Sequence, residues 1–205
     1  MSASPVGTAR DRAKADRSAA LLREGARLFS AAGFDGVSIE DLGAAVGVTG
    51  PAVYRHFRGK RDLLAALLLR TSAQLLDGGR VCMTEHTDPQ DRLRALIDFH
   101  VGFALDQSDV IRVQDRDLGR LAPEERHEVR RLQRAYVELW VDVLADLHPT
   151  AARERLRVQA HAGFGLINST PHSVRGLRDA PDDATVRGIL TDAALAALTM
   201  PVGRR

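Results

Sequence analysis

Apolar residues recur three and four positions apart along most of the 205-residue chain, and runs that alternate apolar with polar residues are scarce. This spacing places the apolar side chains on one face of a helix, so it favours amphipathic helices over strands. The clearest example is the stretch 182–199, where the repeating residues are Val186, Ile189, Leu190, Ala193, Ala194, Ala197 and Leu198. We therefore expect an all-α protein.

The composition limits the setting in which such a protein works. Its hydrophobic fraction of 44% and charged fraction of 27% are close to those of soluble globular proteins. No apolar run approaches the roughly 18 residues that a membrane span needs, and residues 1–17 lack the apolar segment of a secretory signal. The single cysteine, Cys82, leaves no cysteine cluster for a metal. We expect a cytoplasmic protein with no metal, cofactor or membrane partner.

Charge is distributed unevenly along the chain. Residues 1–62 carry ten basic and seven acidic residues, whereas residues 63–205 carry 19 basic and 20 acidic residues. The net charge of +2 is too small for a protein that is polycationic throughout. A polyanionic partner is therefore expected to bind the N-terminal third of the chain.

The first helices are predicted from their end signals. A helix over about 11–32 is followed by Gly33, a residue that commonly ends helices because it adopts the left-handed conformation easily. Ser38 with Asp41 three residues later is typical of a capping box, which opens a second, short helix over about 39–46.

A third short helix follows a tight turn at Gly47. Thr49 is a good N-cap, and Pro51 falls in the first turn of a helix over about 50–57, where its missing N–H costs nothing. Two short helices joined in this way form a helix-turn-helix, whose second helix fits a DNA major groove. Many helical proteins contain such a corner without binding DNA, so the spacing alone leaves the function open.

The residues of the corner are more specific than its spacing. They read Gly33-Phe34-Asp35-Gly36-Val37-Ser38, Ile39-Glu40-Asp41-Leu42-Gly43-Ala44-Ala45-Val46-Gly47-Val48, Thr49-Gly50-Pro51-Ala52-Val53-Tyr54-Arg55-His56-Phe57 and Gly59-Lys60-Arg61-Asp62-Leu63-Leu64. Over residues 18–64 this pattern closely resembles the DNA-binding domain of TetR-family transcriptional regulators. Val37 and Arg61 depart from the family pattern, in which threonine and an acidic residue are usual at these positions.

The resemblance implies a two-part organisation. An N-terminal three-helix helix-turn-helix DNA-binding domain (11–62) follows a disordered tail (1–10), and a C-terminal helical ligand-binding and dimerisation bundle occupies 63–205. Such proteins act as homodimers, because two recognition helices about one turn of DNA apart read a palindromic operator in double-stranded DNA. The partners implied are thus DNA, a second copy of the chain and a small-molecule effector.

Nine residues are predicted to face DNA. Thr49 lies at a helix start, whose free N–H groups suit a phosphate, and Tyr54 and Lys60 are similar to family positions that hold the DNA backbone. Arg55 and His56 are the polar side chains best able to reach base edges or phosphates. The full set is Ser38, Thr49, Gly50, Pro51, Ala52, Tyr54, Arg55, His56 and Lys60.

Several of these residues have a purely structural alternative. Tyr54 and Phe57 lie three apart, so either ring is suited to pack into the three-helix core, and Lys60 has the position of a solvated lysine at the start of the next helix. Arg12, Lys14 and Arg17 are expected either to contact a flanking phosphate or to belong to a solvated tail.

The remaining chain is predicted to form six further helices. The first connects the two domains over about 60–77 and ends before Gly78 and Gly79, with a loop over 82–89. The others are expected at about 90–105, 109–121, 123–147, 150–168 and 182–199. By resemblance, the last two form a four-helix dimer interface with their symmetry mates, although their apolar faces would equally complete the core of each monomer.

A ligand pocket is expected among the middle helices, where apolar walls carry a few polar groups. The candidate lining residues are Phe99, His100, Phe103, Arg112, Asp115, Arg116, Tyr136, Trp140 and Asn168. The alternatives are that the aromatic residues are core, that His100 is a hydrogen-bonded core histidine, and that residues 112–117 form a salt-bridged surface. The polar run 168–173 resembles a segment of TetR-type regulators of lipid or acyl-CoA metabolism, which implies an effector of that type.

These features predict a ligand-responsive repressor that a small molecule releases from its operator. The sequence contains no Gly-x-Ser-x-Gly, Walker-type loop, His-Glu-x-x-His or cysteine pair, so we expect no enzyme and no catalytic residue. The alternative is a constitutive helical DNA-binding or interaction protein without an effector. A packed bundle interior without a cavity would favour that alternative.

Overall fold

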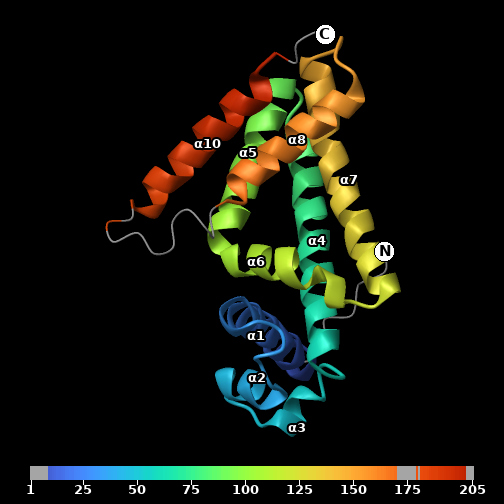
Figure 1. The fold of residues 1–205 in the computed structure, drawn as a ribbon, viewed down its shortest axis with the longest axis vertical. Coiled ribbons are helices and arrows are strands. Elements are labelled where there is room, and N and C mark those ends of the chain that lie inside the picture. The colour runs from blue at the N-terminus through green and yellow to red at the C-terminus, as the bar shows by residue number, and fades with distance from the viewer. Residues whose placement is uncertain (1–8, 170–178, 180, 202–205) are drawn as a thin grey trace.

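The computed structural model describes residues 9–169, 179 and 181–201, and within them every regular element is a helix (Figure 1). The all-α prediction is therefore confirmed. In chain order the elements are α1 (Ala9–Ala32), α2 (Ile39–Ala45), α3 (Gly50–Val53), α4 (Lys60–Glu85), α5 (Pro89–Asp106), α6 (Ser108–Asp117), the 3-10 helix η1 (Leu118–Arg120), α7 (Pro123–Leu147), α8 (Arg153–Ile167) and α10 (Asp183–Thr199).

The helices α1, α2 and α3 form a small unit at one end of the molecule (Figure 1). Its core contains Phe29, Leu42, Val53 and Phe57, so Phe57 has the predicted structural role. The helix predicted over 50–57 is too long, because α3 ends at Val53 and the next residues form hydrogen-bonded turns. The N–H groups of His56 and Phe57 both donate to the Val53 carbonyl, at 2.9 and 3.0 Å, and this tightening turns Phe57 into the core.

The connecting helix α4 is longer than predicted, since it continues through Gly78 and Gly79 to Glu85. A Cβ on Gly79 would lie 2.6 Å from Tyr136 Cε2 of α7, and a Cβ on Gly78 would overlap the Phe99 ring of α5. The two glycines thus allow aromatic rings of neighbouring helices to pack on the α4 backbone. This packing offsets a helix-propensity cost of about 1 kcal/mol per glycine, and the glycines do not end the helix.

The predicted loop 82–89 shrinks accordingly to the residues between α4 and α5. Asp88 caps α5, since its carboxylate accepts from the N–H groups of Gln90 and Asp91 at 2.8 and 3.1 Å. The other predicted helices are present with shifted ends. The helix expected over 109–121 ends as an α-helix at Asp117 and continues as η1, and α8 begins at Arg153.

The larger unit is built around a second core in which α4, α5, α7, α8 and α10 meet. Its largest fully buried side chain is Trp140, and the same core contains the fully buried Leu93, Ile97, Leu144 and Leu156. Helix α10 packs on α5 and α8, with Leu198 against Gly163. In Figure 1 α10 forms the outer edge of this unit.

The two units are joined by apolar packing as well as by the continuous helix α4. The core of the smaller unit takes in Leu63, Leu64, Leu67 and Leu68 of α4, together with Val110 and Val113 of α6, Leu121, and Val129 of α7. The predicted domain boundary after residue 62 therefore falls inside α4. The apolar side chains of α4 pass from the core of the smaller unit to the core of the larger unit one turn or more after this boundary. Among the described helices, none is both long and apolar enough to cross a membrane.

Candidate functional site

The helix-turn-helix corner is fixed by a capping box and by glycines. Asp41 N–H donates to Ser38 Oγ at 3.1 Å, while the Asp41 carboxylate accepts from Ser38 N–H at 2.9 Å and from its hydroxyl at 2.6 Å. These bonds lower the pKa of Asp41. Gly47 adopts φ of 70°, and a Cβ on Gly43 would lie 2.7 Å from the Val48 carbonyl oxygen. The sequence thus dictates a turn that brings α3 across α2.

The predicted DNA-facing residues differ in how they are placed. Thr49, Pro51, Tyr54 and Arg55 are exposed, and Tyr54 has 57% of its surface accessible, which rules out the core alternative for its ring. Gly50 is buried, and a Cβ at this position would lie 3.1 Å from Glu40 Oε1. The small size of Gly50 therefore allows the close contact between α2 and α3. Ser38 uses its hydroxyl in the capping box, and Ala52 and His56 are half-buried.

Lys60 has structural partners. Its Nζ donates to the carbonyl oxygens of Phe34 and Val37 at 2.9 and 3.0 Å, with Asp35 at 3.4 Å, and lies 4.6 Å from the centre of the Phe34 ring. The ammonium therefore ties the start of α4 to the turn between α1 and α2. Contact of Lys60 with DNA stays a prediction, and the solvated-lysine alternative does not describe its position.

A basic groove of about 630 Å³ lies between the first turns of α1 and the residues after α3. Its cationic lining comes from Arg10, Lys14 and Arg17 of α1 together with Arg55, and His56 lies beside them. Partial burial and the charges of Lys14 and Arg17 lower the pKa of His56. The structure thus gathers the basic residues of the predicted tail and of the helix-turn-helix into one concave surface, which suits a phosphate backbone. Residues 1–8 of that tail lie outside the described residues.

An internal cavity of about 190 Å³ lies in the larger unit, between α4, α5, α6, α7 and α8. Four predicted ligand-binding residues line it, namely His100, Phe103, Tyr136 and Asn168. The other lining residues are not among those predicted from the sequence, and they are Ser72, Leu75, Ile111, Gln114, Gln133, Val137, His161 and Phe164. Ser72 carried a usable signal, because it lies four residues from Leu68 and from Leu76 and so shares their buried helix face.

A short hydrogen-bonded chain crosses the cavity wall. His100 Nε2 lies 3.1 Å from Asn168 Oδ1, and the Tyr136 hydroxyl lies 3.2 Å from His100 Nδ1. Because the amide oxygen only accepts, Nε2 carries the proton and Nδ1 accepts from the Tyr136 hydroxyl. Burial lowers the pKa of His100 to about 4, so the ring is neutral near pH 7. His100 is thus both a hydrogen-bonded core histidine and a cavity wall.

Two further polar groups of the wall have no hydrogen-bond partner among the described residues. They are the Ser72 hydroxyl and the Gln133 side-chain NH₂, and both atoms are buried. Buried polar atoms in native proteins are nearly always bonded, to water or a ligand where no protein group is available. This pair therefore marks the cavity as a place where a small molecule can form hydrogen bonds.

The other candidate pocket residues lie elsewhere. Phe99 packs on Gly78, and Trp140 is buried in the aromatic core, with its ring centroid 4.8 Å from that of Phe164. Arg112 and Arg116 do not line the cavity, and neither does Asp115. The sequence pattern selected aromatic and charged residues by type, but the position of each residue around its helix decides which side chains meet the cavity.

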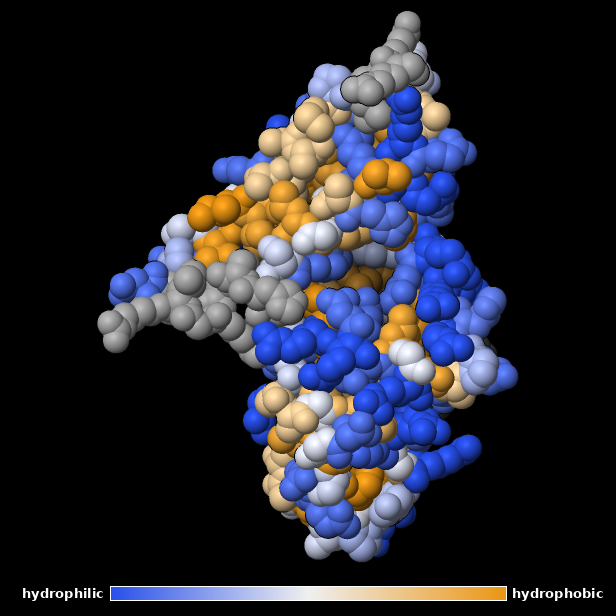
Figure 2. Space-filling model, in the orientation of Figure 1, coloured by the Kyte–Doolittle hydropathy of each residue, from blue (hydrophilic) through white to orange (hydrophobic). Residues whose placement is uncertain are grey.

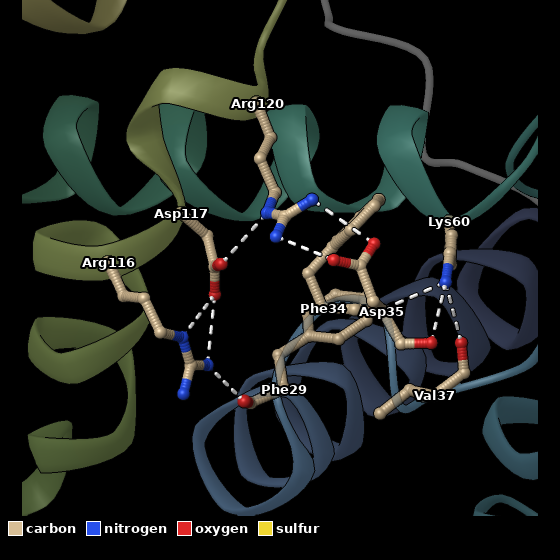
Figure 3. A network of polar contacts seen from close by, with 8 residues as sticks. All are labelled: Phe29, Phe34, Asp35, Val37, Lys60, Arg116, Asp117 and Arg120. Carbon is tan, nitrogen blue, oxygen red and sulfur yellow. Dashed lines mark hydrogen bonds and ion pairs between the residues drawn. The ribbon is translucent and has the colours of Figure 1, made fainter.

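A network of polar contacts connects α6 and η1 with the smaller unit (Figure 3). Asp117, which is 1% exposed, accepts from Arg116 Nη2 at 2.9 Å and from Arg120 Nε at 3.2 Å. Arg116 also donates to the Phe29 carbonyl at the end of α1, and Arg120 pairs with Asp35 in the following turn at 2.6 Å. The run 112–117 therefore contains a salt bridge, as one alternative expected, but its acid is buried, and its arginine also donates to the smaller unit.

Both parts of the chain match protein-family models. Residues 21–67 match the bacterial regulatory proteins of the tetR family, and residues 86–172 match the C-terminal domain of tetracyclin repressor-like proteins. The chain belongs to the TetR family. It therefore belongs to a family of transcriptional regulators that bind DNA operators as dimers and respond to small-molecule effectors.

Individual relatives are distant. Over 88 residues the TetR-family chain is 30% identical to the HTH-type transcriptional activator FasR of Mycolicibacterium smegmatis, and this match spans 43% of the chain and only 40% of the relative. A TetR-family regulator from Bordetella parapertussis 12822 has a TM-score of 0.76 at 21% identity, covering 90% of this chain and 95% of that one. AibR, solved with isovaleryl coenzyme A and operator DNA, has a TM-score of 0.72 at 19% identity, covering 90% and 99%. Similarity at these identities shows the shared fold.

Proposed function

We propose that this TetR-family protein is a repressor that binds a palindromic operator as a homodimer in the cytoplasm and is released when an effector occupies the internal cavity. The observation that carries the proposal is the cavity, which contains the buried, unpartnered polar atoms of Ser72 and Gln133. A constitutive DNA-binding protein has no need for such atoms, and an interior without a cavity would have favoured it.

The DNA-binding surface consists of the exposed residues of α3 and the basic groove beside it. Tyr54 and Arg55 are exposed after the last turn of α3, and Lys14 and Arg17 extend the positive surface along α1. Phosphate contacts of this kind fix the register of a protein on DNA, while Arg55 has the donors to read a base edge. Arg55→Gln should weaken binding and reduce its salt dependence, whereas Arg131→Gln on α7 should leave both unchanged.

The dimer interface is proposed on α8 and α10. Figure 2 shows apolar side chains gathered over these helices, and the exposed ones include Val158, Ile189 and Met200, with 71%, 58% and 63% of their surfaces accessible. An apolar face of this kind in a family of dimers is suited to pack against its symmetry mate. Ile189→Glu should therefore shift the protein to monomers in sedimentation analysis and abolish tight operator binding.

The cavity lining favours a compact effector with an uncharged body. Of the described lining residues none is Asp, Glu, Lys or Arg, and about 190 Å³ is less than the roughly 300–1,000 Å³ of pockets for drug-sized ligands. A short acyl group has this character. The resemblance of the polar run after α8 to lipid-type regulators, and the isovaleryl coenzyme A in the AibR structure, make acyl-CoA thioesters the first effectors to test.

The route from effector to DNA runs through α6. Ile111 and Gln114 of α6 line the cavity, and Arg116 of the same helix, oriented by Asp117, donates to the Phe29 carbonyl at the end of α1. An effector that prefers a shifted α6 would move the two DNA-binding units away from the spacing of one DNA turn. Thermodynamic linkage then requires that operator DNA weakens effector binding by the same factor.

The decisive experiment has two stages. An operator is first selected from a random DNA pool, and compounds are then tested for release of the labelled operator by fluorescence anisotropy. Ser72→Ala should raise the effector concentration for half-release roughly two- to tenfold, the worth of one neutral hydrogen bond. Thr84→Ala, on the outer part of the same helix, is the control. Identical operator affinity at every concentration of all compounds would contradict the gating and favour the constitutive alternative.

The direction of regulation is tested separately. The relative FasR is named an activator, whereas release from an operator by an effector gives repression. A reporter under the selected operator should be silenced by the protein and restored by the effector. Increased expression in the presence of the protein alone would make it an activator.

A further inference from the structure

A second cavity, separate from the one described above, lies between the two units of the molecule. It has a volume of about 190 Å³ and is bounded by α1, α4 and Gln107, where α5 meets α6. Its apolar floor includes the buried side chains of Leu22 and Leu67. It shares no lining residue with the central cavity, so the two cavities are separate sites.

The charge of this interdomain cavity is one-sided. Arg23 of α1 and Arg70 of α4 both line it, and none of its described lining residues is acidic. Neither guanidinium has an ion-pair or hydrogen-bond partner among the described residues. In contrast, Arg27 on α1 pairs with Glu24 at 2.8 Å, and Arg80 on α4 pairs with Asp77 at 3.2 Å. Two unpaired cations from different units thus line one small cavity.

The neutral groups of the wall complete a set of hydrogen-bond donors. The Thr71 hydroxyl and the amide groups of Gln74 and Gln107 line the same cavity as the two guanidiniums. Guanidinium groups bind carboxylate and phosphate through paired N–H donors, and such charge-assisted bonds are about twice as strong as neutral ones. Both arginines are exposed to solvent, so water competes for these bonds, and the apolar floor shields only one side of the cavity.

The adjoining surface determines where a negative charge can lie. A groove of about 520 Å³ continues from this cavity along α4 and α5, with Thr71, Gln74 and Gln107 common to both. That groove carries Asp98 and Asp106, which repel an anion. An anionic ligand is therefore favoured between the two arginines and disfavoured beyond them.

We propose that the interdomain cavity binds an anionic group, carboxylate or phosphate, between Arg23 and Arg70. The bound anion bridges α1 of the DNA-binding unit and α4 of the larger unit. It neutralises two cations that pair with no side chain in the described part of the chain, and it holds the two units in the arrangement of Figure 1.

The test is calorimetric titration of the full-length protein with inorganic phosphate and, separately, with acetate at constant ionic strength. Saturable binding of either probe is expected, and the stronger probe identifies the class of anion. Arg23→Gln and Arg70→Gln should each weaken that binding by about two- to fivefold, the worth of an exposed charge pair. The matched controls Arg27→Gln and Arg80→Gln, whose arginines are already paired, should bind the probe like the wild type.

Competition from the DNA-facing groove is excluded by a further variant. Binding that survives in Arg23→Gln and Arg70→Gln but is lost in Lys14→Gln belongs to the basic groove and overturns the proposal, as does a wild-type protein that binds neither probe. Bridging is read from amide hydrogen exchange, which the anion should slow in both 19–26 of α1 and 67–74 of α4. Protection of only one of these helices contradicts the bridge, and none of these readouts depends on the effector or on DNA release.

Discussion

The contact between α6 and the DNA-binding unit depends on one buried carboxylate, and Asp117→Asn tests it. Asparagine has the same shape, but it replaces one acceptor oxygen by an NH₂ group that faces a guanidinium. In the wild type the carboxylate accepts three N–H bonds, from Arg116 at 2.9 and 3.1 Å and from Arg120 at 3.2 Å. The variant therefore loses the charge, at least one of these bonds, and the orientation of both arginines.

The size of the effect follows from the exposure of the partners. Removing one partner of a fully buried ion pair costs about 3–5 kcal/mol, and a bond to a charged group contributes about 1.5–3 kcal/mol. The side chains of Arg116 and Arg120 are 42% and 43% exposed, so water replaces part of what they lose. We expect the variant to lose about 2 kcal/mol of unfolding free energy, with a Tm roughly 4–8 °C lower for a chain of this length.

The assay is thermal and urea unfolding followed by circular dichroism, on wild type, Asp117→Asn and the control Glu128→Gln. Glu128 forms an exposed pair with Arg131 on α7 at 2.6 Å, so its loss should leave the Tm unchanged. If Asp117→Asn unfolds at the same temperature as Glu128→Gln, the buried carboxylate does not stabilise the contact between the units, and the proposed route through α6 loses its support.

Three further predictions concern other parts of the molecule. Lys60→Met should destabilise the DNA-binding unit by about 1–3 kcal/mol, because it removes the donor to the Phe34 and Val37 carbonyls. Unfolding without DNA measures this loss. Unchanged stability would contradict the structural role of Lys60 and favour the predicted contact with the DNA backbone. Gly78→Ala should lower the Tm, since its methyl group would overlap the Phe99 ring. Gly165→Ala, with nothing within 4 Å of the added methyl group, should instead raise the free energy of unfolding by up to about 1 kcal/mol. The pKa of His100 falls from 6.5 to about 4 on burial, so the unfolded state binds the proton more readily; the stability due to neutral His100 is complete above pH 6.5 and should fall by about 3 kcal/mol as the pH drops to 4, and His100→Gln should remove that part of the pH dependence measured by urea unfolding.

The sequence alone predicts the parts of this protein that depend on local rules. The helical period, the Ser38–Asp41 capping box and the turn at Gly47 are properties of a few neighbouring residues, and the structure confirms them. The continuation of α4 through Gly78 and Gly79 depends on rings from α5 and α7, which no local pattern contains. A glycine pair that usually ends a helix here makes room for its neighbours.

The candidate site shows the same division. The exposed positions of Tyr54 and Arg55 follow from the helix-turn-helix pattern, and the place of His100, Tyr136 and Asn168 in the cavity wall follows from the search for polar groups among apolar helices. The bonds of Lys60 to the Val37 carbonyl and of Arg116 to the Phe29 carbonyl join residues that are 23 and 87 positions apart. Sequence spacing carries no information about such contacts. The residue type alone therefore does not distinguish a side chain that binds DNA or a ligand from one that stabilises the fold.

Helix α6 gives the protein a mechanical constraint that its side-chain chemistry alone does not reveal. Gln114, which touches the cavity, and Arg116, which holds α1, are two positions apart on a helix that turns by about 100° per residue. In the proposed route from effector to DNA, the identities of the cavity residues are free to vary, so that new effectors can be acquired by substitution without changing the DNA-binding unit. The number of residues between Gln114 and Arg116 is not free in that route, because one insertion would rotate the side chain at the cavity away from the one that holds α1. Across related proteins, length in this short helix should be preserved where sequence is not.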